Sequence, residues 1–505
     1  MITLDSFKVL RKLAIKDIHI EQKKVKALYQ VEGFAGEVSS FELIYSYEQP
    51  YFDRLRPADV NLASMMLAQA ALNYGLFFEI IEFDGLFDLT DQKFIKDMME
   101  NTSREILTNK LLVKNEFLKP PFDELKPEKK DRYTQAQIDF VNTQYQHLKL
   151  GREIDETDPA KYAILSSGGK DSLLTYGLVK EFGEPYPIFI NEAGRHWFTA
   201  VNAHRFFHEN EPNTGKPWCN SDRLFNWMLK QLPFIKENFS SIRSDIYPIR
   251  LWTVAIFLFG VLPVARKRGI ANILIGDEYD TTFTGNLQGI THYNGLFDQS
   301  KYFDNIMTRY YRSKGWRINQ FSILRSMSEL LIMKVLIKRY PHLQKHQVSC
   351  HAAHEVNGRM YPCGKCEKCR RIVGMLKALD ENPERCGYSE VQIAQGLKAL
   401  ESHSVKQIRS DASHLYYLML KKNLIQRNRL TEKVAREHAE ITKLRFDKER
   451  SNLEDLPKYI RKPLFNILSQ YADGVVKREN KRWIDVKVDE EFLNEANYRW
   501  DEKQS

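Results

Sequence analysis

The chain has 505 residues, of which 43% are hydrophobic and 28% are charged, the composition of a globular protein with an ample core. This length predicts two or three domains. The formal net charge of +9 is small for the size, so it neither requires nor excludes nucleic acid or anionic small molecules as partners. No secretory pattern follows Met1, and the most apolar stretch, 251–265, is too short to span a bilayer. We therefore expect a cytoplasmic protein without membrane contact.

Residues 1–125 are predicted to form an N-terminal α+β module. Two stretches alternate apolar and polar residues, as half-exposed antiparallel strands do, and two others carry helical spacing. The strand candidates are 18–31 and 41–47, and the helix candidates are 58–74 and 90–112. Pro120-Pro121 and the charged run 128–132 then predict a boundary, with a linker over 126–157.

Strand and helix candidates alternate in the next part of the chain. The strand candidates are 162–166, 187–191 and 271–275, and the helix candidates are 173–182 and 251–267. This alternation predicts an α/β domain over 158–385, with a Rossmann-like parallel sheet and helices on both faces. Residues 386–505 are charged, and we expect a helical region there, including 431–450, that caps the domain or mediates homo-oligomer formation.

The hexapeptide Ser167-Gly168-Gly169-Lys170-Asp171-Ser172 joins the first of these strands to a helix. Such a turn directs backbone N–H groups and a helix N-terminus at one point, which suits a phosphate chain. The two glycines allow close backbone approach, and the two serines add hydroxyl donors. We expect Lys170 to neutralise phosphate charge and Asp171 to cap the helix or help hold Mg²⁺. The spacing differs from that of a Walker A loop.

Polar residues also follow the other two strand candidates. Asn191 ends the second, and Gly276-Asp277-Glu278 follows the third. Because ligands bind at the carboxyl ends of parallel strands, we expect Asn191 in the nucleotide site and Asp277 as a second Mg²⁺ ligand. The stretch to Asp298, which includes His292, is rich in polar groups, and we expect it to form a surface that contacts substrate and Mg²⁺. A solvated turn after a strand is the alternative.

Four cysteines are spaced as metal ligands, namely Cys350, Cys363, Cys366 and Cys369. Four thiolates complete a tetrahedral structural zinc site, and nearby basic residues would offset their charge. His351 or His354 could replace one sulfur, and an iron–sulfur cluster is the rival interpretation. The other two cysteines, Cys219 and Cys386, carry no sign of a nucleophile.

The loop at 167–172 resembles the SGGxDS loop of the ATP pyrophosphatase (PP-loop) superfamily. Members of that superfamily split ATP into AMP and pyrophosphate and adenylate a substrate. The resemblance implies a domain of the adenine nucleotide alpha hydrolase-like type. It also implies ATP and Mg²⁺ as ligands of Ser167–Ser172, and an enzyme as the function class.

Two families within this superfamily share further features with the chain. The segment 322–330 and the cysteine run resemble the family that epimerises the terminal glutamate of UDP-N-acetylmuramoyl-L-alanyl-L-glutamate, over about residues 20–380. The loop combined with four cysteines is also similar to 7-cyano-7-deazaguanine synthases, which adenylate a carboxylate, carry structural zinc and have relatives in defence systems. The sequence departs from the epimerase family at two places. After the third strand, this chain lacks the arginine that the family has, and at position 367 this chain has Glu367 where the family has proline.

The leading hypothesis is therefore an adenylating enzyme that activates a carboxylate or carbonyl of an unidentified substrate. An epimerase-like or a deazaguanine synthase-like reaction would follow adenylation. The rival from another class is a protein that binds nucleic acid and modifies tRNA, for which basic runs such as 266–268 are the only support. A degenerate ATP sensor is a third interpretation, and the complete loop disfavours it.

Overall fold

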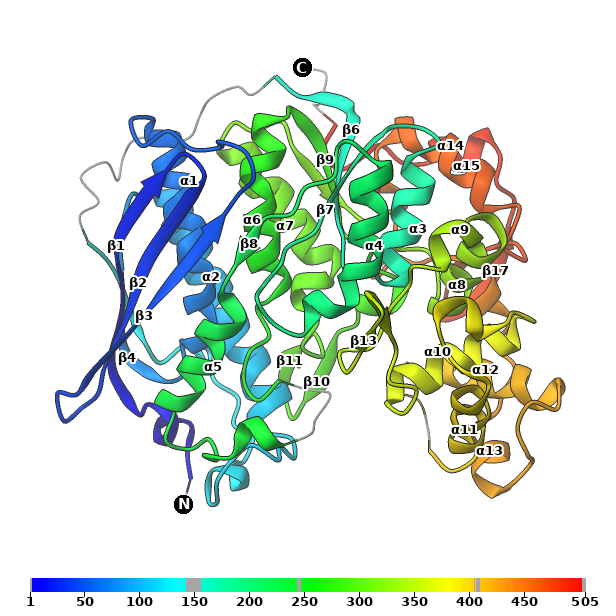
Figure 1. Ribbon diagram of the computed structural model, residues 1–505, viewed down its shortest axis with the longest axis horizontal. Helices are drawn as coiled ribbons and strands as arrows, with labels where there is room; N and C mark the ends of the chain where they lie inside the picture. The colour runs from blue at the N-terminus through cyan, green and yellow to red at the C-terminus, as the bar shows by residue number, and fades with distance from the viewer. Residues whose placement is uncertain (1, 142–155, 243–246, 404, 406–408, 502–505) are drawn as a thin grey trace.

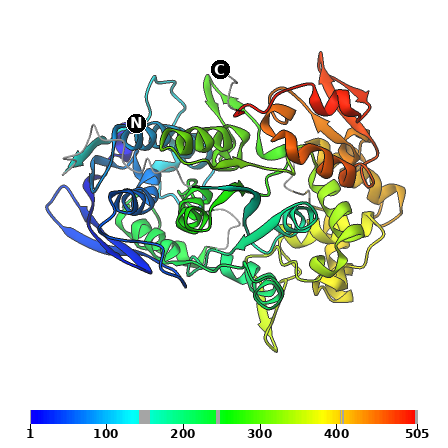
Figure 2. The same cartoon turned by 90° about the horizontal axis from the view of Figure 1, so that it is seen from above.

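The computed structural model describes residues 2–141, 156–242, 247–403, 405 and 409–501. Figures 1 and 2 show the N-terminal sheet and the C-terminal region at opposite ends, with a second sheet and its helices between them. Among the described residues, no helix combines the length and the apolar character needed to cross a membrane.

The N-terminal sheet has six strands in the order β5-β4-β1-β2-β3-β8. Neighbours β1, β2 and β3 are antiparallel, whereas β4 is parallel to β1 and β5 is parallel to β4. The strands are β1 Leu10–Glu21, β2 Lys24–Glu32, β3 Val38–Ser46, β4 Phe78–Asp84, β5 Gln137–Val141 and β8 Trp218–Cys219. The helices of this region are α1 Pro57–Ala68 and α2 Leu89–Ile106, and α5 Ser221–Gln231 packs on β3.

The N-terminal sheet includes two strands from beyond residue 125, where the N-terminal module was predicted to end. Strand β5 lies inside the predicted linker 126–157 and completes one edge of the N-terminal sheet, and β8 comes from far along the chain to pair with β3. Both strands are short, with five and two residues, so they have no local apolar alternation strong enough to reveal them. Pairing with distant strands decides their structure.

The second sheet has four strands in the order β12-β9-β6-β7, and all neighbouring pairs are parallel. Its strands are β6 Asp158–Leu165, β7 Glu184–Ile188, β9 Ile270–Leu274 and β12 Asn319–Phe321. The accompanying helices are α3 Lys170–Val179, α4 His196–Asn210, α6 Val254–Lys267, α7 Lys301–Ser313, α8 Glu329–Arg339 and α9 Pro341–Gln344. The expected parallel α/β sheet is therefore confirmed.

Residues 162–164 of strand β6 are buried on both faces, as parallel strands covered by helices are. Ala163 belongs to the core that extends to the N-terminal sheet, whereas Tyr162 and Ile164 belong to the core around α3 and α8. Helix α6 packs against β6 and β9 and also against α1. Because β6 is an inner strand, the segments that follow β7 and β9 lie on either side of the loop that follows β6.

The C-terminal region is only partly helical. Helices α10 Glu367–Ala378, α11 Glu390–Leu400, α12 Arg409–Lys421 and α13 Arg429–Val434 come first. A three-stranded sheet follows, formed by β15 Leu444–Phe446, β16 Val475–Glu479 and β17 Arg482–Val486, with helices α14 Lys458–Leu468 and α15 Glu490–Asn494. The helix predicted over 431–450 ends at Val434, and the prediction is wrong beyond it, because Leu444 and Phe446 are buried and β15 pairs with β16.

Two short hairpins and the capped N-terminus of α8 lie near the second sheet and the cysteine region. The hairpin of β10 Gly285–Leu287 and β11 Ile290–His292 precedes α7. The hairpin of β13 His354–Val356 and β14 Arg359–Tyr361 lies within the cysteine region and packs against α4. Helix α8 begins after Ser328, whose side chain accepts the backbone N–H of Leu331 at 3.0 Å.

Candidate functional site

The loop at 167–172 needs glycine at its second position. Gly168 has φ +74°, and a Cβ atom there would lie 2.4 Å from the backbone oxygen of Thr199. Gly169 caps the N-terminus of α3, and the only neighbour of a Cβ atom there would be the Ser167 hydroxyl at 3.4 Å. The first glycine therefore allows α4 to pack closely, and the second leaves space above the loop.

The hydroxyl groups of the loop stabilise its turn. Ser172 donates to the backbone oxygen of Gly169 at 3.2 Å and accepts the N–H of Ser167 at 3.4 Å. Thr199 of α4 lies 3.0 Å from the backbone oxygen of Ser167 and can donate to it. Ser167 is exposed, and Gly169 and Asp171 are partly exposed, so one side of the loop is open to solvent.

Lys170 lies in a different setting from the one expected. Its ammonium is 2.8 Å from Asp171, 3.2 Å from Glu329 and 3.4 Å from Glu278, and its side chain is only 7% exposed. Burial alone would lower the pKa of Lys170, but these three carboxylates outweigh burial and raise it. Its charge is thus balanced within the protein, which favours a role in positioning Asp171 over direct phosphate contact.

A chain of ion pairs extends from this lysine to the cysteine region. Glu329, the first residue of α8, also lies 3.6 Å from the guanidinium of Arg371, which in turn lies 4.0 Å from Glu367. Arg371 and Glu367 both belong to α10, the helix that carries Cys369. The loop and the cysteine region are therefore joined through buried charges.

The segment after β9 lies beside the loop, as expected. A Cβ atom on Gly276 would approach the backbone of Asp171 to 2.9 Å. The Asp277 backbone is held by Ser322, which accepts its N–H at 3.1 Å and donates to its carbonyl oxygen at 2.6 Å. The Asp277 carboxylate is 3.6 Å from Arg325, and its Oδ2 has no hydrogen-bond partner among the described residues.

Burial gives the carboxylates of this segment unusual proton affinities. It raises the pKa of Asp277 well above the ordinary range, although Arg325 opposes the shift. It also raises the pKa of Glu278 to about 8, with Lys170 opposing and Glu329 and Asp171 adding to the shift. A bound cation would stabilise these buried carboxylates, because a cation favours their ionised form. Within the described ranges, however, only the four cysteines are preformed as a group of three or more metal ligands.

Residues of the C-terminal region contact Tyr279 and Asp280, which follow Glu278 after β9. The Tyr279 hydroxyl donates to Asp447 at 2.7 Å, and the guanidinium of Arg445 lies 4.0 Å from the centre of the Tyr279 ring. Arg445 is also 3.9 Å from Asp280 and 3.6 Å from Asp411, and it is only 2% exposed. Burial of an arginine needs partners of opposite charge, so this contact fixes the C-terminal region on the acidic segment.

Other polar residues that we expected in the site have structural roles. The Asn191 side chain accepts the N–H of Ala193 at 3.1 Å, and no contact with the loop is observed. Asp298 accepts the N–H groups of Thr253 and Val254 at 2.9 and 2.8 Å, and so caps α6. His292 lies in the β10–β11 hairpin. Asp298 therefore has a structural role at the start of α6, and the contact surface expected over 276–298 stays a prediction.

The four cysteines converge in the folded chain. Their sulfur atoms all lie within 4.8 Å of one another, and Cys366 is 3.7 Å from Cys350 and 3.5 Å from Cys369. Four sulfurs around one ion at a Zn–S distance of about 2.3 Å are separated by roughly 3.8 Å. Cys369 lies in the first turn of α10, whose N-terminal dipole favours a thiolate. The group can hold a metal ion such as zinc.

Two histidines and two further cysteines lie outside the group of four sulfurs. His351 bonds to Lys368 at 3.2 Å and His354 is exposed, so neither replaces a sulfur in the group. Cys219 and Cys386 are buried, and burial raises the pKa of each thiol to about 12. Neither thiol is therefore ionised near neutral pH.

Several polar and charged residues of this site were not predicted from the sequence. Glu329, Arg325 and Ser322 lie in the segment 322–330, which carries the resemblance to the epimerase family, and Arg445 lies in a region expected to be a solvated helix. A charged residue inside an apolar segment, such as Arg325, indicates a buried ion pair, since such residues are buried only with partners. Arg445 has no comparable local signal.

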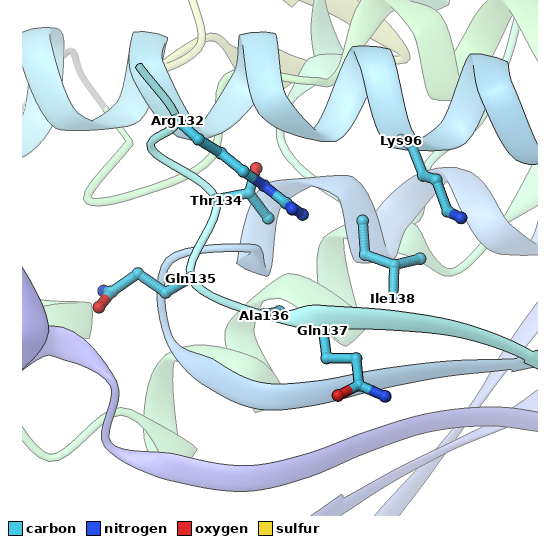
Figure 3. A pocket seen from close by; sticks show the side chains of 7 residues that line it. All are labelled: Lys96, Arg132, Thr134, Gln135, Ala136, Gln137 and Ile138. Carbon is cyan, nitrogen blue, oxygen red and sulfur yellow. The ribbon is translucent and has the colours of Figure 1, made fainter. Parts of the chain in front are cut away.

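A hollow of about 400 Å³ lies at the edge of the N-terminal sheet, between α2 and β5. Figure 3 shows Lys96 and Arg132 on opposite sides of it, with Ile138 between them. No residue of the loop at 167–172 lines this hollow. It is therefore separate from the candidate site.

Comparisons with known proteins gave no match: no family model, no curated protein and no solved structure is significantly similar to the chain.

Proposed function

We propose that the chain is an enzyme that binds Mg·ATP and transfers AMP to an oxygen of its substrate, with release of pyrophosphate. The observation that carries this proposal is the loop at 167–172. Its glycines, open backbone and helix N-terminus follow an inner strand of a parallel sheet, and buried carboxylates lie beside it. We further propose that the sheet is of the PP-loop, adenine nucleotide alpha hydrolase-like type.

The reaction would proceed by displacement at the α-phosphorus of ATP. The substrate oxygen forms a bond to this phosphorus, and the bond to the bridging oxygen breaks, so the charge develops on pyrophosphate. The backbone N–H groups at the start of α3 and the exposed Ser167 hydroxyl would stabilise that charge. Asp171 and Asp277 would hold Mg²⁺, which neutralises phosphate charge. Two carboxylates suffice because Mg²⁺ retains water and phosphate ligands.

The four cysteines would hold one structural zinc ion in this proposal. Four thiolates fill a tetrahedral shell and leave no position for a reacting water. Sulfur separations of 3.5–3.8 Å suit a single ion, whereas a cluster of several iron atoms would hold the sulfurs further apart. Through Glu367 and Arg371, the metal would stabilise the helix that braces Glu329 and the loop.

Product analysis tests the proposed reaction directly. The full chain would be incubated with Mg·ATP and separate acceptors: UDP-N-acetylmuramoyl-L-alanyl-L-glutamate, a deazapurine carboxylate, bulk tRNA and a fractionated metabolite pool. We expect AMP and pyrophosphate with at least one acceptor, detected by mass spectrometry together with the modified product. Formation of ADP and phosphate, or no nucleotide cleavage with any acceptor, would contradict the proposal.

A further inference from the structure

Strand β5 forms one edge of the N-terminal sheet. It pairs in parallel with β4 on one side, and no strand of the described ranges pairs with its other side. Its five residues, Gln137–Val141, extend over about 17 Å. The backbone N–H and C=O groups that face away from β4 are therefore able to bond to a further extended chain.

The hollow of about 400 Å³ between α2 and β5 lies beside this edge. Ala136 and Ile138 form its apolar part, and both are buried. Lys96 and Arg132 are exposed and lie on opposite sides of the hollow (Figure 3). The edge of β5 is thus accompanied by an apolar surface with a cation on either side.

No carboxylate of the described residues forms an ion pair with either cation. The ammonium of Lys96 lies 5.6 Å from the centre of the Phe140 ring, and the nearby Asp97 pairs with Lys93 at 2.7 Å. The exposed guanidinium of Arg132 likewise has no ion pair within the part of the chain that the structure describes. Both cations are therefore available to an anionic group from outside.

The acidic residues around the hollow do not enter it. The two oxygens of Glu100 accept the backbone N–H groups of Tyr133 and Thr134, each at 2.9 Å. Asp131 precedes Arg132, and Asp139 accepts from the side chain of Gln137, but neither carboxylate lines the hollow. Two cations and no carboxylate line it, so the hollow favours an anionic group.

We propose that the edge of β5 binds an extended, acidic segment of a partner protein, with an acidic side chain of that segment between Lys96 and Arg132. A strand added to β5 places alternate side chains on the face of the sheet where Ile138 and Phe140 lie. The two cations flank this face, so they would select acidic side chains, while main-chain hydrogen bonds would supply affinity. A second copy of this chain is a poorer partner, because it would bring its own cations to the same edge. The inference is independent of the proposed function.

Binding of synthetic peptides to the full chain, without nucleotide, tests the inference. The probe is a labelled peptide of about seven residues that alternates threonine and glutamate and so covers the five residues of β5. One control peptide has lysine in place of glutamate, and another has proline at its centre, which removes a main-chain donor. Fluorescence anisotropy measures affinity, and amide hydrogen exchange of 137–141 reports pairing with β5.

The variants of the chain are Lys96→Gln, Arg132→Gln and the double substitution. Lys93→Gln is the matched control, because Lys93 is an exposed lysine of the same helix that does not line the hollow. Thermal unfolding checks that each variant is folded, as expected for exposed positions.

We expect the acidic peptide to bind the wild type and Lys93→Gln with equal affinity and to slow exchange within 137–141. Each single variant should bind it about threefold more weakly, and the double variant about tenfold, as for partly exposed ion pairs. The lysine and proline peptides should bind the wild type more weakly than the acidic peptide. No binding of the acidic peptide, equal affinity for the lysine peptide, or full affinity in the double variant would overturn the inference, as would unchanged exchange within 137–141.

Two further outcomes would assign this edge to a different occupant and so overturn the inference. Displacement of the acidic peptide by inorganic phosphate at a similar concentration would indicate a site for small anions. Protection of 137–141 that increases with protein concentration, in the absence of peptide, would indicate pairing with a second copy of the chain. Because the assay contains no nucleotide, failure of the proposed adenylation reaction would leave its result unaffected.

Discussion

The ammonium of Lys170 lies 3.2 Å from the carboxylate of Glu329, although 159 positions separate the two residues in the chain. Each is the first residue of its helix, Lys170 in α3 and Glu329 in α8. The contact ties the candidate ATP loop to the segment 322–330, and Arg371 extends it to the cysteine region. The stability of the loop therefore depends on distant parts of the chain.

Replacing Lys170 should destabilise the protein as well as the site. Lys170→Ala leaves three carboxylates close together without their cation, which costs about 3–5 kcal/mol in the free energy of unfolding. Urea unfolding measures this loss. The control is Lys398→Ala, whose exposed pair with Glu401 contributes about 0–1 kcal/mol. A Lys170→Ala protein as stable as the control would show that the buried ion pairs contribute little.

The two glycines of the loop should respond differently to an added methyl group. Gly169→Ala meets only the Ser167 hydroxyl, so the fold should persist while close approach of phosphate is blocked. Gly168→Ala meets the Thr199 backbone and requires φ +74°, so it should lower the free energy of unfolding by at least about 1–2 kcal/mol. Thermal unfolding and binding of an ATP analogue separate the two effects. Unchanged analogue binding in Gly169→Ala would contradict a phosphate site above this loop.

Glu278 should make the protein less stable as the pH rises. Its pKa is about 8 in the folded chain because of burial, against 4.5 for the ordinary group. Between these values the unfolded chain has lost the proton that the folded chain retains, so the free energy of unfolding decreases with increasing pH. Glu278→Gln removes this contribution, of up to about 1.4 kcal/mol per pH unit.

Urea unfolding of both proteins at about pH 5, 6.5 and 8 measures that slope. The free energy of unfolding of Glu278→Gln should decrease less with increasing pH than that of the wild type. The control Glu479→Gln, at an exposed position, should have the same slope as the wild type. Parallel slopes for all three proteins would mean that Glu278 is ionised in the folded chain near neutral pH. Asp280, whose pKa burial also raises to about 8, would then be tested in the same way.

Metal analysis should find one zinc ion for each chain. Cys366→Ser removes a ligand whose sulfur lies 3.5 Å from that of Cys369, so it should abolish metal binding and lower the unfolding temperature, because metal binding and folding are linked. Cys386→Ala is the control, as Cys386 is buried outside the group. Iron with labile sulfide, or full metal content in Cys366→Ser, would be incompatible with the proposed site.

The contact of Arg445 with the acidic segment should be visible in hydrogen exchange. Arg445→Met leaves Asp280 and Asp411 without their buried cation, so the amides of 277–282 should exchange faster than in the wild type. The amides of β1 and β2 at the opposite end of the molecule provide the internal reference. Unchanged protection of 277–282 would show that the C-terminal region does not hold this segment.

The sequence alone was sufficient to predict those parts of the structure that depend on residues close together in the chain. The strand, the glycine turn and the helix of 158–179 follow from apolar residues, Gly168 and Gly169 within about twenty positions. The cysteines could be recognised because three of them lie within seven consecutive residues. The parallel sheet could also be predicted, since alternation of strand and helix leaves few other arrangements.

Only the tertiary structure decided which charges meet. Lys170 pairs with Glu278 and Glu329, and Arg445 pairs with Asp280, across separations of more than one hundred residues. Strands β5 and β15 likewise exist because distant strands offer hydrogen-bonding edges. A residue's type determines which partners it needs when buried, but the packing of the whole chain determines which residues are buried and which partners are within reach.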